Sequence, residues 1–147
     1  MNFTSKEDVF AILKSLPSVR GSTPDDIAQV ERQLGVVFPE PYRRFLGAAG
    51  DIVPAGSEMF PLRSLPKQRK EWLSSIDEDD IPIPNRDLVV FFDHTDMFEA
   101  YFFAADGSAD PTVFAYNYYN GDDTPLRQAK LSDFLALRLR DALGIQP

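Results

Sequence analysis

The chain has 147 residues, a formal net charge of −8, 44% hydrophobic residues and no cysteine. This length and apolar content predict one domain over residues 1–147 that folds around its own core. The lack of cysteine excludes disulfide frameworks, thiolate zinc sites and cysteine nucleophiles. Because neither a signal-peptide pattern nor an apolar run of membrane-spanning length occurs, we expect a cytoplasmic protein without a membrane partner.

The first half of the chain reads as three helical segments. A helix is predicted over Ser5–Leu16, where apolar residues recur at helical spacing. The next begins after Thr23, whose hydroxyl can cap a helix that starts at Pro24 and ends at Gly35. An extended elbow and a third, short helix follow, with apolar residues on one face. The second and third helices and the elbow between them form one motif. We assign a structural role, not a binding role, to its residues Thr23, Ile27, Leu34, Gly35, Pro39, Tyr42, Phe45 and Leu46.

The second half switches to strand-like periodicity. A short surface helix over Lys67–Ser75 carries Trp72, which is either a lid over the edge of the core or an exposed contact residue. A loop is expected from Asp77 to Pro84. Strands are then predicted over Leu88–Phe92, Ala100–Ala104 and Val113–Tyr119, and a last helix over Leu131–Leu143 with Ser132 as its cap. This order predicts an α+β fold whose curved, antiparallel-dominated sheet has helices packed on one side.

Acidic residues are concentrated in one part of the chain. Between Ser74 and Pro125 there are twelve acids and one base, Arg86, whereas the rest of the chain has 14 bases and 11 acids. This field argues against nucleic-acid binding and favours a cationic protein partner. The alternative is that the acids only keep the protein soluble.

No residue pattern predicts a catalytic or metal site strongly. Neighbouring acids in Asp77–Asp80 point in different directions on an extended chain, so a solvated loop is favoured over a cation site. Gly121-Asp122-Asp123 follows Asn120 and reads as a hairpin turn. His94 is the only histidine. Asp93 and Asp96 flank His94, so it could act as a general base or a metal ligand. That interpretation is the less favoured one, because His94 lies in a predicted turn, where an exposed or locally hydrogen-bonded imidazole is expected. We therefore expect no cofactor and no enzymatic activity.

Tyrosines lie at the end of the third predicted strand. Tyr116 and Tyr118 share one face and are either interface residues or core residues under the C-terminal helix. Tyr119 points to the other face and is the better candidate for an exposed anchor.

The motif at residues 23–46 resembles the N-terminal motif of the SUKH superfamily, which includes yeast cell-wall-synthesis regulators (Smi/Knr type) and many bacterial immunity proteins. The similarity continues through Phe60–Leu65, Leu88–Asp93, Glu99–Phe114 and Ser132–Leu135, and it is strongest over residues 20–143. One departure is the turn at residues 94–98, where many members have a Gly-Gly-Asp-like sequence. The resemblance implies a SUKH-like fold and an immunity protein that binds and neutralises a polymorphic-toxin domain, often a nuclease or a deaminase.

Such toxins tend to be basic where they bind their substrate, so an acidic surface could mimic the phosphate backbone. The residues predicted to bind the partner are Asp77, Glu78, Asp79, Asp80, Asp96, Glu99, Tyr119, Asp122 and Asp123. We expect a monomer or a weak homodimer. A regulatory scaffold without a toxin partner is the alternative function, and a metal-dependent hydrolase that uses His94 is the third.

Overall fold

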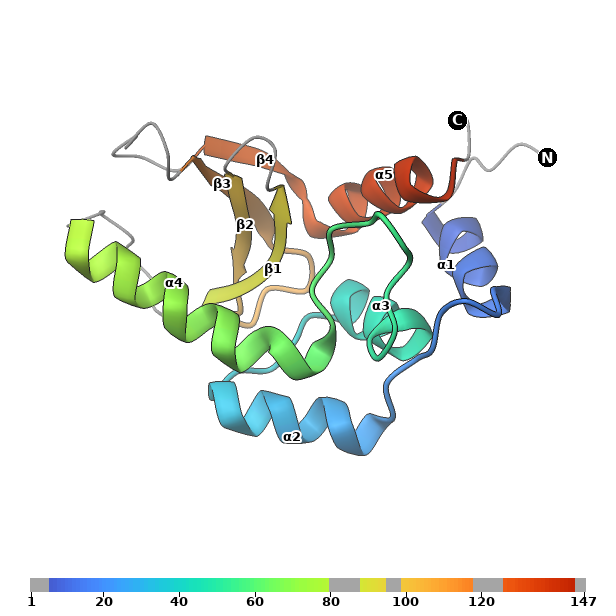
Figure 1. Ribbon diagram of the computed structural model, residues 1–147, viewed down its shortest axis with the longest axis horizontal. Helices are drawn as coiled ribbons and strands as arrows, with labels where there is room; N and C mark the ends of the chain where they lie inside the picture. Colours follow the sequence, from blue (N-terminus) through green and yellow to red (C-terminus); the bar gives the residue numbers. More distant parts are fainter. Residues whose placement is uncertain (1–5, 80–87, 95–98, 118–125, 145–147) are drawn as a thin grey trace.

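The computed structural model describes residues 6–79, 88–94, 99–117 and 126–144 (Figure 1). Helices come first in this part of the chain, then an antiparallel sheet, then a closing helix, which confirms the predicted α+β class. The elements are α1 (Lys6–Ser15), α2 (Pro24–Leu34), α3 (Glu40–Ala49), the 3-10 helix η1 (Leu62–Ser64), α4 (Leu65–Asp79), β1 (Leu88–His94), β2 (Glu99–Ala104), β3 (Thr112–Asn117), β4 (Leu126–Lys130) and α5 (Leu131–Leu143).

The strands form a meander in the order β1-β2-β3-β4. The pairing of β1 with β2 shifts register between Val90 and Phe92. Such a bulge lets two successive side chains face the same side of the sheet, where strict alternation would separate them. Phe91 and Phe92 accordingly lie in the same buried cluster, with exposed fractions of 0% and 2%. The bulge therefore adds an aromatic ring to one face of the sheet.

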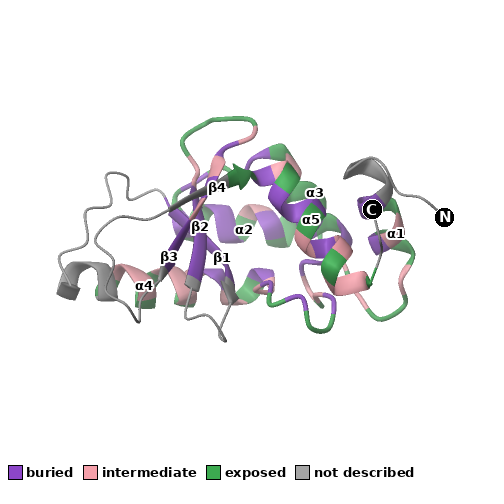
Figure 2. Cartoon of the chain, turned by 90° about the horizontal axis from the view of Figure 1, so that it is seen from above, coloured by how far each residue is buried: buried purple, intermediate pink, exposed green. Residues whose placement is uncertain are grey.

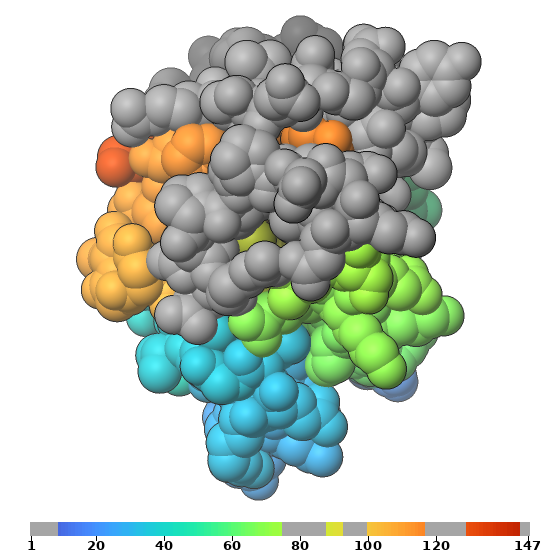
Figure 3. Space-filling view, turned by 90° about the vertical axis from the view of Figure 1, so that its left-hand side faces the viewer, coloured from blue at the N-terminus to red at the C-terminus, as the bar shows by residue number. Residues whose placement is uncertain are grey.

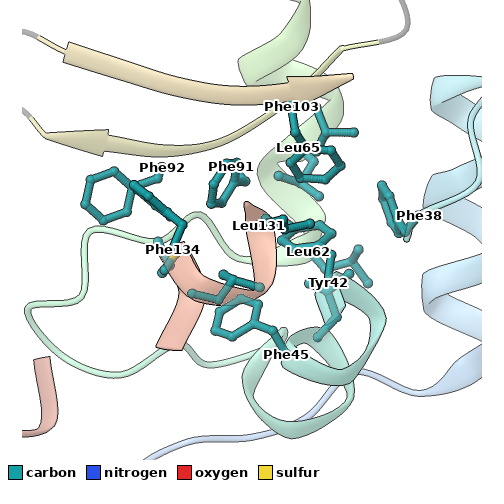
Figure 4. Close-up of a cluster of buried hydrophobic side chains, with 14 of the residues drawn as sticks. Phe38, Tyr42, Phe45, Leu62, Leu65, Phe91, Phe92, Phe103, Leu131 and Phe134 are labelled. Carbon is teal, nitrogen blue, oxygen red and sulfur yellow. The ribbon is translucent and has the colours of Figure 1, made fainter. Parts of the chain in front are cut away.

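That face belongs to the large core, which α1, α2, α3 and α5 share and in which Tyr42 contacts several aromatic rings (Figure 4). Helix α1 joins this core by packing on α3 and α5. The Tyr42 ring lies 5.2–6.0 Å, centroid to centroid, from the rings of Phe38, Phe45, Phe91 and Phe103. Its hydroxyl is buried without a hydrogen-bond partner among the described residues, and burial raises the pKa of the phenol. The motif residue Tyr42 is thus the point at which the helices meet the sheet.

The opposite face of the sheet forms the small core, which consists of Leu88, Val90, Ala100, Phe102 and Tyr116. Helix α4 covers it, with Trp72 and Leu73 packed against these side chains (Figures 1 and 2). The expectation of helices on one side of the sheet therefore holds for the large core, and α4 is an addition on the other face.

The Trp72 ring lies 4.8 Å from the ring of Phe102 and 5.9 Å from that of Tyr116. Of the two interpretations of Trp72, the structure shows the lid. Tyr116 is a core residue, but it lies under α4 and not under the C-terminal helix as expected.

The predicted ends of α2 are confirmed. The hydroxyl of Thr23 accepts a hydrogen bond of 3.1 Å from the Asp26 backbone N–H, and Pro24 opens the helix. Gly35 ends it with a φ of 69°, in the left-handed region that glycine adopts without a steric penalty.

Two predicted boundaries are wrong. Helix α4 runs on to Asp79, so Asp77–Asp79 are helical and not in a loop. Packing of Trp72 and Leu73 on the sheet stabilises the helix beyond what its polar C-terminal sequence suggests. Ser132 does not cap α5, because the N-cap position is Lys130. Instead, the carboxylate of Asp110 accepts hydrogen bonds from the Ser132 backbone N–H at 2.9 Å and from its hydroxyl at 2.6 Å.

The strand β4 was not predicted, because Leu126–Lys130 lacks the alternation of apolar and polar residues that is typical of a strand. It pairs with β3 at one edge of the sheet, and α5 begins directly after it. Strand β3 is described as far as Asn117, and Tyr118 and Tyr119 of the predicted strand lie outside the described residues.

Replacement of Tyr42 separates the contribution of its ring from that of its hydroxyl. Tyr42→Ala should lower the free energy of unfolding by ~3–5 kcal/mol, since it empties the centre of the large core. Tyr42→Phe should stay within about 1 kcal/mol of the wild type or exceed it, because the hydroxyl has no partner to lose. Urea denaturation of both variants measures this difference. A large loss for Tyr42→Phe would contradict the arrangement described here.

Candidate partner-binding site

The elbow between α2 and α3 is held by a buried carboxylate. Glu31 has an exposed fraction of 7% and lies at the inner end of α2. Its carboxylate accepts hydrogen bonds from Arg43 Nη2 at 2.8 and 2.9 Å and from the Phe38 backbone N–H at 2.7 Å. This one side chain therefore joins α2, the elbow and α3. This role cannot be predicted from the sequence, although Glu31 stands inside the motif, because the spacing of apolar residues does not reveal a buried charge.

Motif residues on both helices are buried around this elbow. Ile27 and Leu34 of α2 have exposed fractions of 8% and 7%, while Phe45 and Leu46 of α3 have 0%. These side chains belong to the large core. They hold α2 and α3 in place, and because they are buried they cannot contact a partner.

The structure places three of the predicted partner-binding residues at one helix end. Asp77, Glu78 and Asp79 are the last residues of α4, whose final turn contains no basic residue. The C-terminal end of this helix extends beyond the sheet (Figure 1). The carbonyl end of a helix carries a partial negative charge, so acids there add to the same sign. We name Asp77, Glu78 and Asp79 the α4 acidic end.

A fourth predicted residue lies at one end of the sheet. Glu99 opens β2, and its register partners are His94 of β1 and Asn117 of β3. By chain connection, residues 95–98 join His94 to Glu99, and residues 118–125 join Asn117 to Leu126, so both segments attach to this end of the sheet. Five predicted residues lie outside the described residues: Asp80, Asp96, Tyr119, Asp122 and Asp123.

The described residues thus bring together the three acids of α4, and they bring Glu99 next to His94 and Asn117 in register. They do not link the α4 acidic end to Glu99. Figure 3 views the molecule from the side to which α4 extends, with α4 in light green beside the cyan α2–α3 region. Trp72 and Tyr116, two aromatic candidates, are used within the small core.

Among the described residues, no three His, Asp or Glu side chains are grouped so that they could hold a metal ion. None of the helices in this part of the chain has the length and apolar character needed to cross a membrane.

The fold and its motif define a class of small α+β domains in which a pair of N-terminal helices packs against an antiparallel sheet. A family model described as SMI1 / KNR4 family (SUKH-1) matches residues 21–137, and the chain belongs to this family. No curated protein sequence was found to match the chain. The matched range includes α2, the elbow, α3, α4, the sheet and the first half of α5.

Removal of the Glu31 side chain should weaken the joint between the helices. Glu31→Ala should lower the free energy of unfolding by ~2–4 kcal/mol, because it leaves the Phe38 N–H buried and Arg43 unpaired. The half-exposed position of Arg43 keeps the loss below that of a fully buried pair. Urea denaturation should be compared with Glu40→Ala, an exposed acid in the first turn of α3. Equal losses for both variants would contradict the role of Glu31.

Proposed function

We propose that this domain is an immunity protein, which binds a basic toxin domain of the nuclease or deaminase type and blocks its active site. Membership of the SUKH-1 family supports a role in protein binding, since the family resemblance implies non-catalytic immunity or regulatory proteins. The observation that carries the proposal is the α4 acidic end, where three carboxylic acids follow one another at a helix C-terminus without a base.

This arrangement is unfavourable for the free protein. Acids in the last turn of a helix repel its partial negative charge, at a cost of ~0.3–1 kcal/mol each at exposed positions. A cationic partner would convert that repulsion into attraction, and charges at the rim of an interface mainly accelerate association. A sequence selected for stability alone would place Lys or Arg there. The acids are therefore better explained by binding than by folding.

Further acids belong to one end of the sheet and to the segments attached to it. Glu99 opens β2, and the sequence adds Asp96, Asp122 and Asp123 in the two segments attached to that end. A toxin that acts on nucleic acid needs cationic side chains to hold phosphates. An immunity protein with several carboxylates could occupy those side chains. We propose Tyr119 as the aromatic anchor of this interface, and binding rather than catalysis as the activity of the domain.

The proposal is tested by identifying the partner and its toxicity. Tagged protein is used to capture partners from lysate of its source cells at low and at high salt, and the retained proteins are identified by mass spectrometry. We expect a basic domain that is retained at low salt and reduced at high salt, because salt screens exposed charges. Expressed alone it should stop growth, and co-expression with this chain should restore growth. A captured protein that is harmless when expressed alone would favour the regulatory scaffold.

Charge reversal at the α4 acidic end should separate binding from stability. Asp79→Lys should slow association with the captured domain about threefold or more and reduce its salt dependence. The same change should leave the free energy of unfolding unchanged or raise it by up to ~1 kcal/mol, because it places a cation at the helix C-terminus. Asp79→Lys combined with Asp80→Lys should have the larger effect on association.

The matched control is Asp141→Lys, an exposed acid in the last turn of α5. It makes the same change of net charge in the last turn of a helix, at a different helix end (Figure 1). We expect its association rate to equal that of the wild type. Equal rates for Asp79→Lys and Asp141→Lys would show that only net charge matters, and no effect of either would reduce the acids to a solvated surface.

A further inference from the structure

A second surface of the domain is apolar and lies beside a cation, in contrast to the α4 acidic end. A groove of about 590 Å³ lies where the α2–α3 elbow meets the turn between β2 and β3, and its walls include Ala28, Arg32, Val36, Val37, Ala105 and Gly107. In Figure 3 the orange β2–β3 turn lies next to the cyan α2–α3 elbow. We name this feature the elbow groove. Its volume is in the range of sites that hold small ligands or short peptide segments.

The wall of the elbow groove is apolar and held in place. The side chain of Val37 has an exposed fraction of 68%, whereas its neighbours Val36 and Phe38 have 8% and 2%. In an extended chain alternate side chains face opposite ways, so burial of Val36 and Phe38 forces Val37 outward. Glu31 fixes this orientation by accepting two hydrogen bonds: the Phe38 N–H donates to its carboxylate, and the Val36 N–H donates to its backbone carbonyl at 3.1 Å. The exposed valine is thus presented on a rigid support.

The charge that the groove offers to a ligand depends on which of its charged side chains are already paired. Glu31 also lines the groove, but its carboxylate is engaged by Arg43 and by the Phe38 N–H. Arg32, the next residue of α2, is exposed, and no carboxylate of the described residues lies within 4.0 Å of it. The acid of the β2–β3 turn, Asp106, accepts a hydrogen bond from the Ser108 backbone N–H. Arg32 is therefore the cation available to a ligand in the groove.

We propose that the elbow groove binds a short peptide segment of a protein partner in which an aliphatic side chain stands next to a carboxylate. The aliphatic side chain packs against Val36, Val37 and Ala105, and the carboxylate pairs with Arg32. Arginine is well suited to this task because its guanidinium donates two parallel hydrogen bonds to a carboxylate. The required charge is opposite to that of a partner for the α4 acidic end, so this proposal does not rest on the proposed function.

The test is a selection of random peptides displayed on phage against the wild-type protein, in which multivalent display retains weak ligands. The full chain with Val37→Asp and the full chain with Arg32→Glu serve for counter-selection. Both residues are exposed, so we expect both variants to fold, which circular dichroism checks. We expect enrichment of sequences with an aliphatic residue beside Asp or Glu, and loss of their binding to both variants.

Titration of ¹⁵N-labelled protein with synthetic Ac-Ala-Leu-Glu-Ala-NH₂ then maps the site. Saturable shifts should be confined to residues 28–37 and 105–107, and the Leu-Lys analogue should bind about two- to fivefold more weakly, as an exposed ion pair allows. Arg32→Glu should reverse this preference, while Lys70→Glu, which changes an exposed cation of α4, should not. Enriched peptides that are basic, that bind both groove variants as well as the wild type, or that never emerge would overturn the proposal.

Discussion

A buried carboxylate at the end of α2 sets the geometry on which the rest of the domain depends. Glu31 accepts hydrogen bonds from the elbow and from α3, and so fixes how the chain leaves one helix and enters the next. Burying a charge is costly unless its hydrogen bonds are satisfied. Because Arg43 and the Phe38 N–H both satisfy this carboxylate, alternative paths of the elbow would remove at least one of these hydrogen bonds. The angle between α2 and α3 is thereby specified, and with it the site at which Tyr42 enters the large core.

The two faces of the sheet form two separate cores. The bulge in β1 turns Phe91 and Phe92 to the large core, which α1, α2, α3 and α5 complete. The small core has fewer buried residues, and Trp72 and Leu73 of α4 pack against it. Helix α4 is thus anchored at its middle and extends past the sheet at its C-terminal end (Figure 1). An anchored helix with an acidic end is a suitable support for charges that meet a partner.

Periodicity and capping predicted the helices of the first half, because their signals are local. Thr23, Pro24 and Gly35 mark both ends of α2 within the sequence itself. What could not be predicted depends on contacts distant along the chain. The cap of α5 comes from Asp110, some twenty residues earlier, and the length of α4 depends on the fit of Trp72 to a sheet that follows it. The buried role of Glu31 is of the same kind.

The candidate site shows the same division. The sequence predicted acids as the binding residues from their number, and the structure adds that three of them occupy the end of one helix. The elbow groove could not be predicted from the sequence. Only the fold exposes Val37 and places Arg32 beside it.

The position of Trp72 gives this protein a built-in optical reporter. It is the only tryptophan of the chain, and its indole packs edge to face on Tyr116 and tilted on Phe102, over the small core. Its emission therefore depends on how α4 is seated on the sheet. Excitation at wavelengths that select tryptophan would follow α4 alone. Detachment of this helix and melting of the whole domain would then appear as two separable spectroscopic events in unmodified protein.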